Sequence, residues 1–248
     1  MNVTRSKRTK KKNPEGYEVP IELLQPWSTF VLKTKLPPEV LEKMIRITDE
    51  IVENRESATS HGGQLVGQIE DEFVIETEIL KVPISHSNQK KLIEFFLEMC
   101  KFYVIKAQCQ SHPFNKEKWI KEEWSTYITS MWMVSQKDNE YNPIHTHEHC
   151  HLSTVMYLKI PEYLPSRKTN RNEDGCIVFT NNVARDVFWG VPTITLKPQV
   201  GDFFIFPASQ QHFVYPFRSP DGKGERRSVS FNAGFSTKTE QELILYKS

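Results

Sequence analysis

Four of the eight histidines in the chain stand at every second position of the segment HTHEHCH, residues 145–151. In a β-strand, alternate residues project from the same face about 6.5 Å apart, which is close enough for two imidazoles to bind one metal ion. His145 and His147 meet this requirement, as do His147 and His149. Clustered imidazoles repel one another once protonated, so a role that keeps them neutral is expected. The spacing therefore predicts a metal site.

A metal ion needs at least one more ligand from another part of the chain. His61 lies in a glycine-rich loop, and His86 and His112 precede the strand-rich region. By position, His212 in GDFFIFPASQQHFVYPF is the best candidate. Two ligands from one strand end and one from a later strand form a facial set, which leaves positions open for a chelating cosubstrate and dioxygen.

The segment ERRSVSFN offers a cation for the distal carboxylate of such a cosubstrate. In a strand, the residues of its polar face would be Arg226, Ser228, Ser230 and Asn232, opposite Arg227, Val229 and Phe231. A polar interior face is unusual unless it lines a cavity. Arg226 can bind a carboxylate through two parallel hydrogen bonds, with the Ser228 hydroxyl beside it. Alternatively, Arg226 and Arg227 are exposed charges beside the turn SPDGKGE.

Composition sets the broad class. The chain has 248 residues, of which 38% are hydrophobic and 25% charged, the balance of a globular protein with a sizeable core. Lys and Arg total 32 against 31 for Asp and Glu, so no global field attracts nucleic acid or a membrane. Four cysteines without CxxC spacing predict reduced thiols.

The N-terminus carries a basic run, RSKRTKKK, within a segment (1–16) that we expect to be a disordered arm. The sequence has no apolar run of the ~20 residues needed to cross a bilayer and no apolar secretory segment. We therefore expect a cytoplasmic location, or the host cytoplasm if the protein is viral.

The remaining 17–248 are expected to form one domain. Apolar spacing predicts helices at 37–54 and 88–110, in a helical N-terminal portion at about 37–110. Short β-branched and aromatic runs predict strands at 28–36, 125–135, 152–160, 175–180, 193–198, 201–207, 212–217 and 226–235. The fold class is therefore mainly β, an antiparallel double-sheet roll or barrel with N-terminal helices packed outside. The segment at 165–175 reads as a surface loop or lid.

Three segments together resemble the core of the iron- and 2-oxoglutarate-dependent oxygenases: NPIHTHEHCHLSTVMYLKIP, GDFFIFPASQQHFVYPF and ERRSVSFN. They occur in the order of that superfamily, within residues 124–235. The sequence is most similar to an uncharacterised branch found in marine bacteria and their phages, and more distantly to prolyl hydroxylases.

This resemblance implies a double-stranded β-helix, the cupin-like jelly roll. It also implies Fe(II) and 2-oxoglutarate, with His145 and His212 as iron ligands and Arg226 on the remote carboxylate. Tyr157, in STVMYLK, would hydrogen-bond the same carboxylate.

The second ligand departs from the superfamily, because His147 stands where Asp or Glu is usual; the similar branch also carries His-x-His. Either His147 completes a three-histidine site, or it turns away and the metal keeps an open position or takes Glu148. A strand would point Glu148 to the other face. We assign His149 and His151 to the cavity rim or to the surroundings of the ligands.

The leading hypothesis is a dioxygenase that hydroxylates a peptidyl side chain or a small metabolite and releases succinate and CO2. Its partners would be 2-oxoglutarate, O2 and a primary substrate that the sequence does not identify. One alternative is a three-histidine cupin-type dioxygenase that does not use 2-oxoglutarate. Another is a non-catalytic metal-binding jelly roll. Trp132, Tyr141 and Trp189 either line a pocket or belong to the core or surface.

Overall fold

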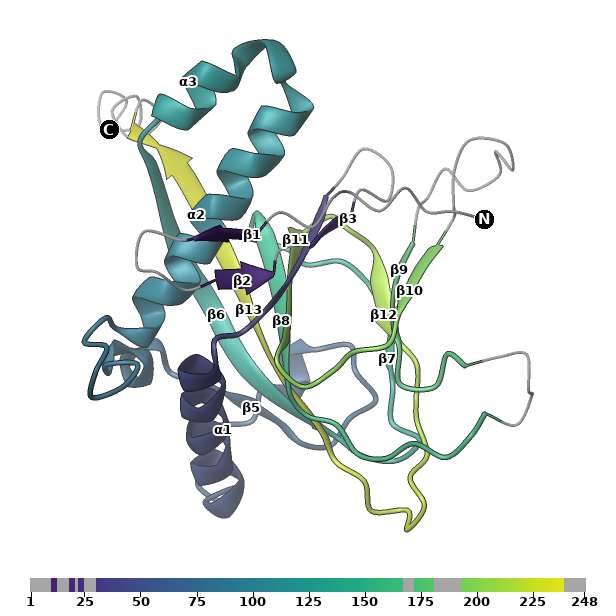
Figure 1. The fold of residues 1–248 in the computed structure, drawn as a ribbon. Coiled ribbons are helices and arrows are strands. Elements are labelled where there is room, and N and C mark those ends of the chain that lie inside the picture. Colours follow the sequence, from purple (N-terminus) through teal and green to yellow (C-terminus); the bar gives the residue numbers. More distant parts are fainter. Residues whose placement is uncertain are drawn as a thin grey trace.

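The computed structural model describes residues 10–12, 18–20, 22–24, 30–166, 172–180 and 193–238. Two antiparallel sheets lie face to face, and helices cover the outer face of the larger one (Figure 1). This is the mainly β jelly-roll architecture that the sequence predicts. No helix among the described residues is both long and apolar enough to span a membrane.

The larger sheet has seven strands, and its central strands are long and buried. In spatial order they are β3 (Glu22–Leu24), β4 (Val31–Lys35), β11 (Asp202–Pro207), β8 (Leu152–Lys159), β13 (Arg226–Thr237), β6 (Trp124–Gln136) and β5 (Glu72–Val74). The N-terminal strands β3 and β4 lie at one edge and pair with β11, whereas the C-terminal strand β13 lies between β8 and β6. Neighbours in the sheet are thus far apart in the sequence, as in a roll rather than a meander.

The smaller sheet has four strands: β10 (Thr193–Leu196), β9 (Ile177–Thr180), β12 (His212–Val214) and β7 (Asn142–His145). Figure 1 shows it on the side of the larger sheet away from the helices. A separate ribbon pairs β1 (Lys10–Lys12) with β2 (Glu18–Pro20). Of the predicted basic arm the structure describes only β1, and the rest of residues 1–16 lies outside the described residues.

Alternation along β11 shows how the sequence builds two cores. Phe203 and Ile205 belong to the cluster between the larger sheet and the helices, whereas Phe204 and Phe206 belong to the cluster between the two sheets. All four side chains are at most 1% exposed. Full burial of each such side chain contributes roughly 1.5–3 kcal/mol. This strand therefore holds both layers together.

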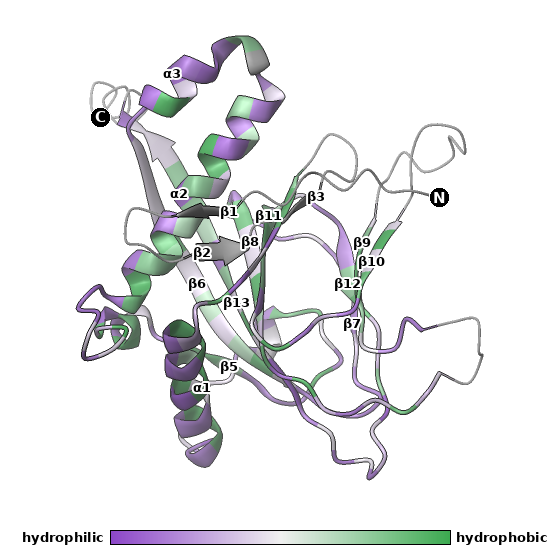
Figure 2. Cartoon of the chain, viewed as in Figure 1, coloured by the Kyte–Doolittle hydropathy of each residue, from purple (hydrophilic) through white to green (hydrophobic). Residues whose placement is uncertain are grey.

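Three α-helices are described: α1 (Pro38–Glu53), α2 (Leu92–Ser111) and α3 (Lys116–Lys121). Proline opens α1, where its missing N–H costs nothing. Hydrophobic and hydrophilic residues lie on different sides of α1 (Figure 2), and Val40, Met44 and Ile47 are buried against the sheet. The second helix begins at Leu92 rather than near the predicted Asn88. Short 3-10 turns lie at Gly62–Gln64, Thr77–Lys81 and Pro113–Asn115.

All four cysteines are free. The predicted strands after residue 124 are all present, with ends that differ by a few residues. The short strands β5 and β7, three and four residues long, were not predicted from the sequence, and neither were β1 to β3. Part of the predicted 165–175 loop, at 167–171, lies outside the described residues.

Candidate metal centre

The first two histidines of the site meet through strand pairing. His145 ends β7 and His212 begins β12, and the two residues are direct cross-strand partners in the smaller sheet. Such partners have Cβ atoms about 4.5–5.5 Å apart on one face of the sheet. Their ring centroids are 4.2 Å apart. Sheet register therefore fixes the pair.

The third histidine reaches the cluster from a loop. The strand spacing by which the sequence analysis paired His145 with His147 does not hold, because β7 ends at His145 and His149 has a positive φ of 57°. The backbone N–H of His147 donates to the carbonyl of Ala208 at 2.9 Å, which ties this loop to the turn before β12. That hydrogen bond, rather than strand alternation, places His147 beside His212.

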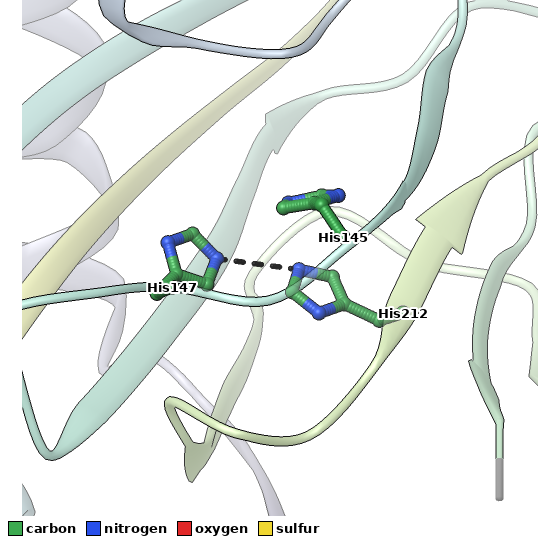
Figure 3. Close-up of side chains that lie close together, drawn as sticks. All are labelled: His145, His147 and His212. Carbon is green, nitrogen blue, oxygen red and sulfur yellow. Dashed lines mark hydrogen bonds between the residues drawn. The ribbon is translucent and has the colours of Figure 1, made fainter. Parts of the chain in front are cut away.

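The three side chains converge (Figure 3). One nitrogen from each of His145, His147 and His212 lies within 4.8 Å of the other two. Nε2 of His147 and Nε2 of His212 are 3.4 Å apart. By contrast, Glu148 is exposed, and the structure does not bring it into this cluster.

Backbone carbonyls fix the tautomers of two of the imidazoles. Nδ1 of His145 is 2.7 Å from the carbonyl of Pro143, and Nδ1 of His212 is 2.9 Å from that of Gln210. A carbonyl only accepts, so each Nδ1–H donates and each Nε2 keeps its lone pair. This is the arrangement by which proteins orient metal-binding histidines.

Burial keeps the cluster uncharged. It lowers the pKa of His147 to about 3, with a further contribution from the charge on His145. Burial likewise lowers the pKa of His212 well below its usual value, ahead of the effects of His145 and His147. The pKa of His145 is also lowered by burial, against the opposing effect of its hydrogen bond to Pro143. Neutral imidazoles with free lone pairs suit a borderline divalent cation such as Fe(II). The donor set therefore fits the metal that the sequence implies.

A cavity of about 490 Å³ contains the three histidines. Its wall includes the predicted polar face of β13, because it is lined by Arg226, Ser228, Ser230 and Asn232. That prediction is confirmed. Tyr157 of β8 and Trp132 of β6 also line the cavity. Tyr141 is not among the lining residues, and Trp189 lies outside the described residues.

Arg226 is buried at the end of this wall. It is 3% exposed, so the alternative that it is a surface charge is wrong. Its guanidinium donates to the carbonyl of Gly175 at 2.7 Å and to Oε1 of Gln136. Both acceptors are neutral. Arg227, on the opposite face of the strand, is also buried, but it pairs with the carboxylates of Asp49 and Glu225.

Nε of Arg226 and the nearby hydroxyl of Tyr157 are buried without a hydrogen-bond partner in the described part of the chain. The guanidinium carbon lies 5.7 Å from the centre of the Tyr157 ring. Burial raises the pKa of Tyr157, so its hydroxyl stays protonated and can donate. Together with the Ser228 hydroxyl, these donors form a subsite that fits a carboxylate.

The other two histidines of the run differ in position. His149 is exposed and lines the cavity, as the rim assignment predicts. His151 is not among the lining residues; its Nδ1 accepts a hydrogen bond from the backbone of Phe235 at 3.2 Å.

The sequence analysis passed over His61, which lines the cavity and lies 5.3 Å from Trp132 between ring centroids. Nothing local in the sequence marks this contact, because the two residues lie on a loop and a strand that are far apart in the chain. Gln136, which accepts from Arg226, was missed for the same reason.

A jelly roll whose cavity contains three neutral imidazoles and a buried arginine has the features of a metal-dependent oxygenase. Residues 130–232 match the model of a family described as "Putative 2OG-Fe(II) oxygenase", where 2OG is 2-oxoglutarate. This segment includes all three histidines and Arg226, and its match confirms the resemblance predicted from the sequence.

No curated protein sequence matches the chain. Among solved structures, a Pseudomonas putida prolyl-4-hydroxylase is similar with 12% identity and a TM-score of 0.46, over 82% of this chain and 92% of that one. A viral collagen prolyl hydroxylase from Paramecium Bursaria Chlorella virus-1 has 13% identity and a TM-score of 0.39, over 82% and 94%.

A 2OG-Fe(II) oxygenase family oxidoreductase from Burkholderia pseudomallei has 13% identity and a TM-score of 0.34, and the match spans 52% of this chain and 56% of that one.

Proposed function

We propose that this chain is an iron(II)- and 2-oxoglutarate-dependent dioxygenase that hydroxylates an unactivated C–H bond of a peptidyl side chain or a small metabolite, releasing succinate and CO2. The main support is one cavity that contains both a three-imidazole cluster and a buried arginine hydrogen-bonded to neutral acceptors. A 2-oxo dicarboxylate uses both features, because its 2-oxo acid end chelates a metal and its other end is an anion.

In this proposal His145, His147 and His212 hold Fe(II), which when bound supplies the activation of dioxygen and the oxidation of the C–H bond. The chain's own residues position the reactants and exclude water. Arg226 and Tyr157 bind the remote carboxylate of 2-oxoglutarate by charge-assisted hydrogen bonds. The Ser228 hydroxyl adds a third donor. Buried Phe206 and Ile177 line the same cavity and add apolar surface to its wall.

A three-histidine dioxygenase that does not use 2-oxoglutarate is the second candidate. It is favoured by the absence of a carboxylate from the cluster that the described residues form. Arg226 would then bind the carboxylate of the substrate itself. A metal-binding jelly roll without catalysis would share the cluster but would consume no oxygen.

Calorimetry on the purified protein distinguishes these candidates. We expect anaerobic Fe(II) to bind at one site per chain, and 2-oxoglutarate to bind only after the metal. His212→Ala should abolish metal binding, whereas His151→Ala, from the same histidine run but outside the cavity, should not. Arg226→Met should weaken 2-oxoglutarate binding at least about tenfold, since a charge-assisted pair is lost.

Oxygen and succinate assays complete the test. Oxygen consumption that needs no 2-oxoglutarate would select the second candidate. Metal binding without either activity, across candidate peptides and metabolites, would favour the non-catalytic alternative. If Arg226→Met binds 2-oxoglutarate as tightly as the unmodified protein, the cosubstrate assignment is wrong.

A further inference from the structure

The polar wall of the cavity continues past the histidine cluster. Because β13 pairs with both neighbours, its cavity-facing residues and their cross-strand partners form four rungs about 7 Å apart. From one end of the wall to the other, the rungs are Arg226 with Gln136, Ser228 with Val134 and Tyr157, Ser230 with Trp132, and Asn232 with Ser130 and Ser153.

The histidine cluster lies beside the third rung. The indole of Trp132 is 6.0 Å from the imidazole of His147 between ring centroids. Arg226 is two rungs away in one direction, about 14 Å along the strand, and Asn232 is one rung away in the other, about 7 Å. A molecule that joins the cluster to Arg226 therefore leaves the Asn232 end open. Asn232 and Ser130 both line the cavity there.

The Asn232 end contains an unused hydrogen-bond acceptor. Oδ1 of Asn232 is buried and has no hydrogen-bond partner in the described part of the chain. A buried amide oxygen in this state destabilises the fold unless a bound molecule donates a proton to it. The neighbouring hydroxyl of Ser130 and the indole of Trp132 are also uncharged.

Charge at this end is low. Of the charged side chains that line the cavity within the described residues, Arg226 lies at the opposite end and Glu148 is exposed. Gln64 and Leu65 also line the cavity, as does His61, which is 5.3 Å from Trp132 between ring centroids and whose pKa burial lowers.

We propose that Asn232, Ser130 and Trp132 form the subsite for the primary substrate, in which Asn232 accepts a hydrogen bond from an N–H or O–H of an uncharged group such as an amide. This inference rests on the proposed function, since it takes the Arg226 end for 2-oxoglutarate. Asn232 is thus a specificity-determining residue that selects for a proton donor near the reacting carbon.

The test uses two probes that differ by one proton donor. N-acetylglycine methylamide and methyl N-acetylglycinate have the same shape, but the second has an ester oxygen in place of the terminal N–H. Each is titrated against protein loaded with Mn(II), with and without 2-oxoglutarate, and the paramagnetic broadening of the probe's methyl resonances is measured by NMR. Broadening reports binding near the histidine cluster without any turnover.

We expect the amide to bind about 3- to 10-fold more tightly than the ester, the range for one hydrogen bond. Asn232→Leu should abolish this preference. Asn232→Asp keeps an acceptor and should retain the preference for the amide. Asn115→Leu, a control at an exposed residue that does not line the cavity, should retain it as well. Thermal melts establish whether each variant is folded. If Asn232→Leu does not fold, Asn232→Asp alone tests whether the preference for the amide depends on an acceptor at this position.

Equal broadening by the two probes, or no broadening by either, overturns the proposal. So does a preference that survives in Asn232→Leu or is lost in Asn232→Asp. The proposed function is judged separately, by whether 2-oxoglutarate binds the Mn(II)-loaded protein and whether Arg226→Met weakens that binding. Because the probes are also tested without 2-oxoglutarate, the Asn232 subsite can be judged even if the chain does not bind 2-oxoglutarate, and the reverse also holds.

Discussion

Replacing Glu72 by glutamine changes the pH dependence of folding, because this carboxyl group is buried and no cation among the described residues pairs with it. Glu72 lies in β5, is 1% exposed, and neither of its oxygens has a hydrogen-bond partner in the described part of the chain. Burial raises its pKa to about 7, and the nearby Glu140 adds to the effect. The carboxyl lies under the loop that forms one cavity wall: a Cβ on Gly67 would be 2.9 Å from its Oε1.

The sign follows from which state binds the proton. A free glutamate titrates at 4.5 and the buried one at about 7, so between these values the folded protein keeps a proton that the unfolded chain has lost. Folding stability therefore falls as pH rises from 4.5 to 7 and is constant, with respect to this group, on either side. At about 1.4 kcal/mol per pH unit, the loss amounts to at most about 3 kcal/mol.

Urea denaturation at pH 5 and pH 8 measures this effect. We expect Glu72→Gln to be more stable than the unmodified protein at pH 8 by up to about 3 kcal/mol, and much closer to it at pH 5. The two proteins differ only at residue 72, so the difference in their pH dependence reports on this carboxyl group. Glu140→Gln serves as a control, because it leaves the burial in place and should remove only a part of the effect. An equal change in stability from pH 5 to pH 8 in the two proteins would refute the reasoning.

Three further variants test single contacts. Tyr157→Phe removes a buried hydroxyl without a partner, so we expect unchanged or higher stability in urea, with 2-oxoglutarate affinity reduced about 3- to 10-fold in calorimetry. Arg227→Met removes a buried cation that bridges Asp49 and Glu225, and leaves Asp49 paired only with Lys159 and Glu225 bonded only to the Ser135 hydroxyl; it should lower the free energy of unfolding by roughly 1–3 kcal/mol while 2-oxoglutarate binding is unaffected. His147→Ala should weaken Co(II) binding at least about tenfold in calorimetry, whereas His149→Ala should not; the reverse order would show that His147 turns away from the metal.

The β-strands were predictable where the sequence alternates over many residues. In β13, seven residues that alternate with period two separate the polar cavity face from a face that includes Val229 and Phe231, and the structure places both faces as predicted. A strand with one polar and one apolar buried face has a single stable register, because a slip of one residue would exchange them. Arg226 could therefore be placed in the cavity from the sequence, although the sequence alone did not exclude an exposed position.

The histidine run shows where such patterns fail. Its alternation is that of a strand, but β7 ends at His145 because the chain turns there to follow the β11–β12 connection, where it hydrogen-bonds to Ala208. The sequence analysis grouped His147 with His145 because alternate strand residues share a face, and the structure has no strand at His147. The approach of His61 and Glu72 to the cavity depends on contacts between segments about 60–70 residues apart in the chain, such as the pairing of β5 with β6. Local periodicity does not encode these contacts.

The three-histidine cluster affects the net charge of the cavity, and this charge bears on what can bind at the Asn232 end. If the ligands are neutral imidazoles, as their lowered pKa values indicate, a divalent metal keeps its full charge of +2, whereas a carboxylate ligand would reduce it to +1. Arg226 adds +1 at the far end, and 2-oxoglutarate brings −2. The loaded cavity then has a net charge of about +1, in surroundings where charges are poorly screened. A cationic group beside the cluster would be repelled there. An uncharged proton donor held by Asn232 would not, so the missing carboxylate and the neutral residues at the Asn232 end favour the same kind of substrate.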